Sequence, residues 1–227
     1  MMLDITLQVA RFDPDLNAET RLQDCFLQME EQRMVLDALL EIRDLQDGSL
    51  AFRHSCRSGI CGSCAMMING QPKLACQAKL AEVAEDGLIR LEPLAGFRVL
   101  CDLVVDIDPF LESLKAIVPW LVLRPNYNGW MSPEALAEIE AMGICVLCGA
   151  CEVGETQAGT GLASLTKTYR FALDPRDALG PERIKLAVDL GLLKWPPYEG
   201  FAAECPKGIK FEKGLIPALR ALTVQQE

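Results

Sequence analysis

The chain has 227 residues, 50% of them apolar, and a formal net charge of −10 at neutral pH. This length allows two modest domains, and the acidic balance argues against nucleic acid or an anionic lipid surface as a direct partner. No run of uncharged apolar residues is long enough to cross a bilayer. The start, MMLDITLQV, has neither a basic nor a long apolar segment, so we expect no secretory signal and a reducing compartment for the ten cysteines.

The first hundred residues are predicted to mix strands and a helix. Apolar and polar residues alternate over 5–9 and again over 25–29, on either side of a turn-like segment near Asn17, which predicts a hairpin. Residues 31–45 then change to the helical period. Further short strands are expected at residues 64–69, 88–92 and 102–107.

The first group of cysteines follows the predicted helix, in HSCRSGICGSCAMMINGQPKLAC. Its C-x(4)-C-x(2)-C spacing with a distant fourth cysteine is the plant-type pattern of a 2Fe-2S cluster. Gly59 and Gly62 allow the backbone to wrap tightly and aim amide groups at the sulfides. The predicted ligands are Cys56, Cys61, Cys64 and Cys76.

The second half of the chain is predicted to be helical. Residues 1–108 form the first domain, a connector rich in Pro, Trp and Asn covers 109–131, and the helical domain covers 132–227. Its first helix is expected to begin after an N-cap at Ser132 and to end at a glycine cap, Gly143. Later helices are expected over 162–173, 181–193 and 208–224.

The second group of cysteines lies in CVLCGAC, with a remote cysteine followed by Pro206. Bacterial-type ferredoxins divide the ligands of a 4Fe-4S cluster in this way. The predicted ligands are Cys145, Cys148, Cys151 and Cys205. The bacterial run normally continues with a further Cys-Pro pair, and here that position holds Glu155 and Thr156.

Five motifs in order now indicate a family: FRHSCRSGICGSCAMMING, RVLCDLVVD, CVLCGAC, YRFALDPRD and CPKGI. Over nearly the whole chain the sequence resembles the iron-sulfur subunit of succinate dehydrogenase and fumarate reductase. The resemblance implies an α+β protein with an N-terminal plant-type (β-grasp) 2Fe-2S ferredoxin domain and an all-helical bacterial-ferredoxin-like domain. By position, the two cysteine groups match the family's 2Fe-2S and 4Fe-4S ligands.

The same resemblance implies a role in electron transfer rather than in bond chemistry. Such a subunit relays single electrons between the FAD of a flavoprotein subunit and quinone in a membrane anchor, so we expect a cytoplasmic protein held at the inner membrane through its partners. The family's 3Fe-4S cluster does not carry over, because its three ligands align with Glu155, Trp195 and Phe201. Without that cluster, the downstream partner is either a differently built anchor or a soluble redox protein.

Other functions compatible with these residues are a zinc-bound scaffold, a stand-alone ferredoxin-type carrier, and the iron-sulfur subunit of a flavoprotein that acts on another substrate. Two further cysteines, Cys25 and Cys101, lie in strand-like apolar surroundings and are expected to act as small hydrophobic residues. The single histidine, His54, excludes a Rieske centre and is expected in the loop near the first cluster. Acidic stretches near Glu30 and Glu138 are expected to be solvated helix faces.

Overall fold

The computed structural model describes residues 1–16, 19–153, 161–189, 205–211 and 216–224. By packing, the chain divides into two compact units. The first consists of Met1–Ile107 with Val146–Gly154, and the second of Asp108–Cys145 with Glu155–Glu227. This grouping differs from the expected 132–227 domain, because the stretch from residue 146 packs with the N-terminal half.

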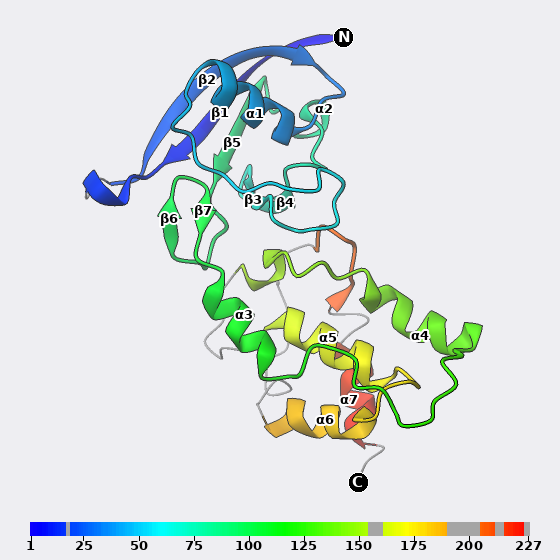
Figure 1. The fold of residues 1–227 in the computed structure, drawn as a ribbon. Helices are drawn as coiled ribbons and strands as arrows, with labels where there is room; N and C mark the ends of the chain where they lie inside the picture. Colours follow the sequence, from blue (N-terminus) through cyan, green and yellow to red (C-terminus); the bar gives the residue numbers. More distant parts are fainter. Residues whose placement is uncertain (17–18, 154–160, 190–204, 212–215, 225–227) are drawn as a thin grey trace. The chain divides into compact units, whose positions relative to one another are not determined.

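The first unit contains a five-stranded sheet in the order β2-β1-β5-β3-β4 (Figure 1). The long strands β1 and β2 form the predicted antiparallel hairpin, with the short 3-10 helix η1 between them, and β1 pairs with β5 in parallel. Strand β3 is antiparallel to both β4 and β5. The elements are β1 Met2–Arg11, η1 Pro14–Leu16, β2 Arg21–Glu30, β3 Ala65–Ile68, β4 Gln71–Leu74 and β5 Leu88–Glu92.

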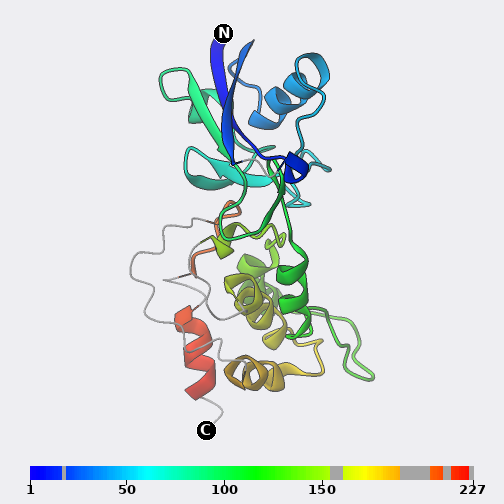
Figure 2. The same cartoon turned by 90° about the vertical axis from the view of Figure 1, so that its left-hand side faces the viewer.

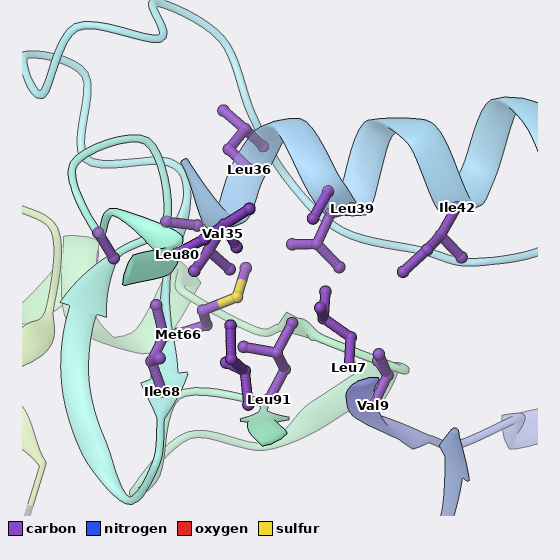
Figure 3. Close-up of a cluster of buried hydrophobic side chains, with 14 of the residues drawn as sticks. Leu7, Val9, Val35, Leu36, Leu39, Ile42, Met66, Ile68, Leu80 and Leu91 are labelled. Atoms are coloured by element: carbon purple, nitrogen blue, oxygen red, sulfur yellow. The ribbon is translucent and has the colours of Figure 1, made fainter. Parts of the chain in front are cut away.

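Helix α1, Val35–Leu45, covers one face of this sheet and confirms the predicted helix (Figure 2). Its Leu39 and Ile42 point toward Leu7, Met66 and Leu91 of the strands (Figure 3). All five side chains are at most 1% exposed. Because side chains alternate along a strand, every second one faces the helix, so the sheet and α1 share one core.

Three short elements differ from the expectations. Strand β4 contains Pro72 and was not predicted, but an edge strand tolerates a residue without an amide hydrogen. The expected strand over 102–107 is instead the second arm of a hairpin, β6 Val99–Cys101 and β7 Val104–Val105, whose turn contains Asp102. Helix α2, Leu80–Val83, was also not predicted, and it buries Leu80 and Val83.

The named elements in the described part of the second unit are all helices. Helix α5 contacts α3, α4 and α6, and α6 contacts α7. The helices are α3 Asp108–Lys115, α4 Pro133–Gly143, α5 Leu162–Ala172, α6 Gly180–Asp189 and α7 Ile216–Val224, and the 3-10 turn η2 Ala150–Glu152 belongs to the first unit. No helix of the described ranges is long and apolar enough to cross a membrane.

Several helix boundaries can be compared with the expectations. The N-cap is confirmed, since the Ala135 amide donates to Ser132 Oγ at 3.2 Å. Gly143 is the last helical residue rather than the cap, because Ile144 follows it in right-handed conformation. The expected connector contains α3, and residues 208–210, where the last helix was expected to start, are not helical, whereas Ile216–Val224 is. The predicted end of the 181–193 helix lies outside the described residues.

In the second unit, a buried ion pair joins the loop between α5 and α6 to α6 itself. Asp177 and Arg183 are at most 2% exposed and bond at 2.7 Å. The Arg183 guanidinium also donates to the carbonyl oxygens of Val118 and Trp120, at 2.5 and 2.7 Å. The irregular stretch after α3 is therefore attached to α6 through one side chain.

A second buried ion pair closes the first unit. Arg11, at the end of β1, donates to Asp102 Oδ1 at 3.0 Å, and also to Gln23, Asp47 and Ser49. Asp102 in turn accepts from the backbone amides of Phe12 and Ala51, at 3.0 and 2.8 Å. This network connects the strand end, the end of α1, the start of the cysteine loop and the β6–β7 turn.

We predict that Asp102→Asn destabilises the first unit by about 3 kcal/mol, because it removes one charge of a buried pair and leaves Arg11 undercompensated. Asn adopts the left-handed backbone of this position (φ 45°) readily, so the change tests charge rather than strain. Urea unfolding followed by circular dichroism measures the effect. Asp86→Asn is the matched control, with φ 50° and an exposed side chain, and an equal loss there would contradict the role of the pair.

Candidate metal centres

The β3–β4 hairpin positions two of the four cysteines of the first group. Cys64 immediately precedes β3 and Cys76 follows β4, and both side chains are buried. The Ala75 amide donates to the Cys64 carbonyl oxygen at 3.1 Å, which holds the two ends of the hairpin together. Cys56 and Cys61 are exposed on the loop that leads from α1 into β3.

Backbone amide groups surround the sulfur of Cys56. The amides of Ser58, Ile60 and Cys61 donate to its Sγ at 3.4, 3.3 and 3.2 Å. These bonds, that of Ser58 first, lower the pKa of Cys56 to about 5, because they stabilise the thiolate. A thiolate is the form that binds iron, so this loop fits an iron-sulfur cluster.

The pKa of Cys64 is shifted in the opposite direction. Burial raises the pKa of its thiol to about 12, and the neighbouring Cys76 and Cys61 sulfurs act in the same direction. A buried thiolate therefore needs a positive partner, which iron provides when it is bound. The two exposed and two buried cysteines together provide the four sulfur ligands that a 2Fe-2S cluster requires.

Two side chains next to these cysteines were missed in the sequence. Ser63 Oγ lies 3.1 Å from Cys61 Sγ, and Gln77 Nε2 donates to the Cys76 carbonyl oxygen at 2.9 Å. Their only signal in the sequence is that each lies one or two residues from a cysteine. His54 is in the loop as expected, with its Nε2 3.1 Å from Arg43 Nη1.

Glycine is required at position 62 for a reason beyond the tight wrapping of the loop that we expected. Gly62 has φ +72°, and a Cβ at this position would lie 2.9 Å from both Cα and Cβ of Cys148 and 3.0 Å from the Val146 carbonyl oxygen. The loop of the first cysteine group therefore touches the backbone of the second group directly. Only glycine allows this approach.

The segment from residue 146 to 153 packs on the first unit. Cys148 packs against the main core, and a Cβ on Gly149 would lie 3.0 Å from the Phe97 ring. Left-handed conformations at Leu147 and Gly149 coil the chain before the turn η2. Cys151 Sγ donates to the neighbouring Glu152 carboxylate at 3.7 Å.

The other two cysteines of the second group belong to the second unit. The Cys145 amide donates to the Met142 carbonyl oxygen at 3.3 Å, so Cys145 follows directly from the end of α4. Lys167 Nζ donates to the Cys145 carbonyl oxygen at 3.1 Å. Cys205 begins a turn in which the Gly208 amide donates to its carbonyl oxygen at 2.8 Å.

The expectation of apolar surroundings for the two remaining cysteines holds for Cys25, whereas Cys101 is only partly buried and lies near charged residues. Cys25 is buried in β2 and Cys101 lies in β6, and burial raises the pKa of both thiols. Glu30 ends strand β2 rather than lying on a helix, and Glu138 is exposed on α4.

The residues expected in place of a third cluster, Glu155, Trp195 and Phe201, lie outside the described residues. Among the residues that the structure describes, no group of three or more His, Cys, Asp or Glu side chains is arranged to hold a metal ion. The two predicted ligand sets therefore rest on their spacing and on the surroundings of the individual cysteines.

Comparison with known proteins supplies the family. Residues 6–112 match the family described as "2Fe-2S iron-sulfur cluster binding domain". The fumarate reductase iron-sulfur subunit of Haemophilus influenzae is 34% identical over 90% of this chain and 88% of its own length. The corresponding subunit of Mycobacterium tuberculosis is 36% identical over 92% and 89%. The chain belongs to the family of fumarate reductase and succinate dehydrogenase iron-sulfur subunits.

Members of this family from mitochondria also match, among them the succinate dehydrogenase [ubiquinone] subunit of Dictyostelium discoideum, at 32% identity over 93% of this chain and 80% of its own length. A chain of the Mycobacterium smegmatis Sdh1 complex shares the fold, with a TM-score of 0.86, 22% identity, and coverage of 100% of this chain and 98% of its own. The expected α+β protein with a 2Fe-2S ferredoxin-type domain and helices is thus confirmed.

We predict that the two kinds of thiol in the first group react very differently in cluster-free protein. Alkylation by iodoacetamide requires the thiolate, so Cys56 should react at neutral pH and lose reactivity only as the pH falls through about 5. Cys64 should stay unmodified until the pH approaches about 12. Mass spectrometry of peptides alkylated across this range measures both, and identical pH profiles for the two thiols would contradict the asymmetry.

We predict that Gly62→Ala loosens the 146–153 segment. The added methyl group must displace the Cys148 backbone, at a cost of about 1–3 kcal/mol beyond the strain of its left-handed conformation. Faster amide hydrogen exchange in residues 146–153 and a lower melting temperature are the expected results. Gly70→Ala is the control, with the same φ of +72° but no atom within 4 Å, and equal effects of the two changes would refute the contact.

Proposed function

We propose that this chain is the electron-transfer subunit of a succinate dehydrogenase or fumarate reductase type complex. It relays single electrons between the FAD of a flavoprotein subunit and a downstream carrier. The observation that carries the proposal is similarity to named iron-sulfur subunits over 90% or more of the chain, together with the amide groups that surround Cys56.

The first cofactor site is a 2Fe-2S site at Cys56, Cys61, Cys64 and Cys76. Its support is the plant-type spacing, the lowered pKa of Cys56 and the burial of Cys64 and Cys76. The cluster supplies a one-electron carrier when it is bound. The chain's own part is to hold negative charge on the sulfurs through backbone amides and to shield the buried pair from water.

The second site is a 4Fe-4S site at Cys145, Cys148, Cys151 and Cys205. Its support is the bacterial-type spacing and the coiled backbone at Leu147 and Gly149. The close approach of Gly62 to Cys148 brings the two cysteine loops into contact within the first unit. Electron transfer between two carriers depends on such close packing, so this contact suits a relay.

We further propose that the third cluster of the family, 3Fe-4S, is absent. Glu155, Trp195 and Phe201 stand where its cysteine ligands are expected, and none of these three side chains offers a thiolate. Quinone reduction at the usual place would then lack its last carrier. The downstream partner is a soluble redox protein or an anchor built differently, and attachment to the cytoplasmic side of the membrane is through partner subunits.

The test is the iron and acid-labile sulfide content of anaerobically purified protein, with electron paramagnetic resonance of the oxidised and reduced states. About six irons per chain, with no oxidised 3Fe-4S signal, is the expected result. About nine irons with that signal would overturn the two-cluster proposal. A colourless protein that contains zinc would overturn both cluster sites, and failure to co-purify with a flavoprotein from the native cell would favour a stand-alone carrier.

A further inference from the structure

A single cation from α5 reaches the first cysteine of the second group. Lys167 lies in the middle of α5, and its Nζ donates to the backbone carbonyl oxygen of Cys145 at 3.1 Å. The two residues are 22 positions apart in the sequence and belong to the same unit. The side chain is half-buried, so its charge is less screened by water than that of a surface lysine.

This contact has one ordinary explanation. Cys145 follows directly after the C-terminal end of α4, where unsatisfied carbonyl groups carry partial negative charge. Helix α4 has no basic residue in its own last turn, so Lys167 could serve simply as a cation that stabilises this helix end. A neutral hydrogen-bond donor would satisfy the same carbonyl group.

We infer that Lys167 also sets the reduction potential of the cluster bound at Cys145, as a positioning residue that acts by charge. This inference rests on the proposed 4Fe-4S site. Reduction adds one electron, and so one negative charge, to the cluster and its thiolates. A fixed ammonium group held at the backbone of one ligand residue stabilises that added charge and raises the potential.

The position of Lys167 favours an effect of its charge on the cluster over an effect limited to the end of α4. Lys167 and Cys145 belong to the same unit and are joined by a hydrogen bond. Their proximity therefore does not depend on how the other ligands complete the site. Backbone amides act on the sulfur of Cys56 in the first loop, whereas here a full charge is placed behind a ligand. The field of a full charge falls off with distance more slowly than that of a dipole, so it still acts at the range of the cluster.

The test compares three variants in the whole complex. Lys167→Gln keeps a donor but removes the charge, Lys167→Arg keeps the charge, and Lys185→Gln removes the same charge from an exposed position on α6. The midpoint potential of the 4Fe-4S cluster is measured by electron paramagnetic resonance during a dithionite titration, in which dithionite is oxidised as the cluster gains its electron. Iron content and melting temperature are measured on the same samples.

For Lys167→Gln we expect about a tenfold lower ratio of reduced to oxidised cluster at a given potential, which equals about 59 mV for a one-electron couple. Lys167→Arg and Lys185→Gln should stay close to the unmodified protein. An unchanged potential in Lys167→Gln overturns the inference and leaves the helix-end role. The inference is likewise overturned if both Lys167 variants lose the cluster, or if Lys185→Gln shifts the potential equally. Absence of any 4Fe-4S signal in the unmodified protein would instead overturn the proposed function.

Discussion

The buried bond between Arg11 and Asp102 is the constraint on which the first cysteine loop depends. Burying two charges is costly, and here the cost is offset by further hydrogen bonds from Arg11 to Gln23, Asp47 and Ser49. Asp102 also accepts from the amide of Ala51, five residues before Cys56. The start of the loop is therefore held by the sheet, through hydrogen bonds that do not involve the cysteines.

A second constraint acts in the same loop, at Gly62. The missing side chain of Gly62 is what allows the backbone of Cys148 to approach. Residues 146–153 consequently pack with the first unit, although they follow α4 in the sequence. The two packing units therefore do not coincide with continuous stretches of sequence. The contact between the Gly62 loop and Cys148 places residues 146–153 in the first unit.

The sequence could predict the parts of this fold that depend on local pattern. The hairpin and α1 follow from periods of two and 3.6 residues, and the Ser132 cap from its side chain. Helix α3 was missed because prolines and tryptophans after it obscured a short helical stretch, and Gly143 was misassigned because a glycine near a helix end need not adopt a left-handed conformation. The contact of Lys167 with Cys145 has no local signal, since it depends on how α5 packs against α4.

The donors described at Cys56 and at Cys145 differ in kind, and this difference has a consequence for how each can change. Amide groups act on Cys56 Sγ, and no side-chain substitution removes a backbone N–H except replacement by proline. One donor at Cys145 is the side chain of Lys167, so a single substitution removes that charge. A side chain also lies at the first group, since Ser63 Oγ is 3.1 Å from Cys61 Sγ, but a hydroxyl is neutral whereas Lys167 carries a full charge. In the proposed relay, exchange of Lys167 would therefore change the driving force at the second site by charge alone, whereas exchange of Ser63 would remove only a dipole.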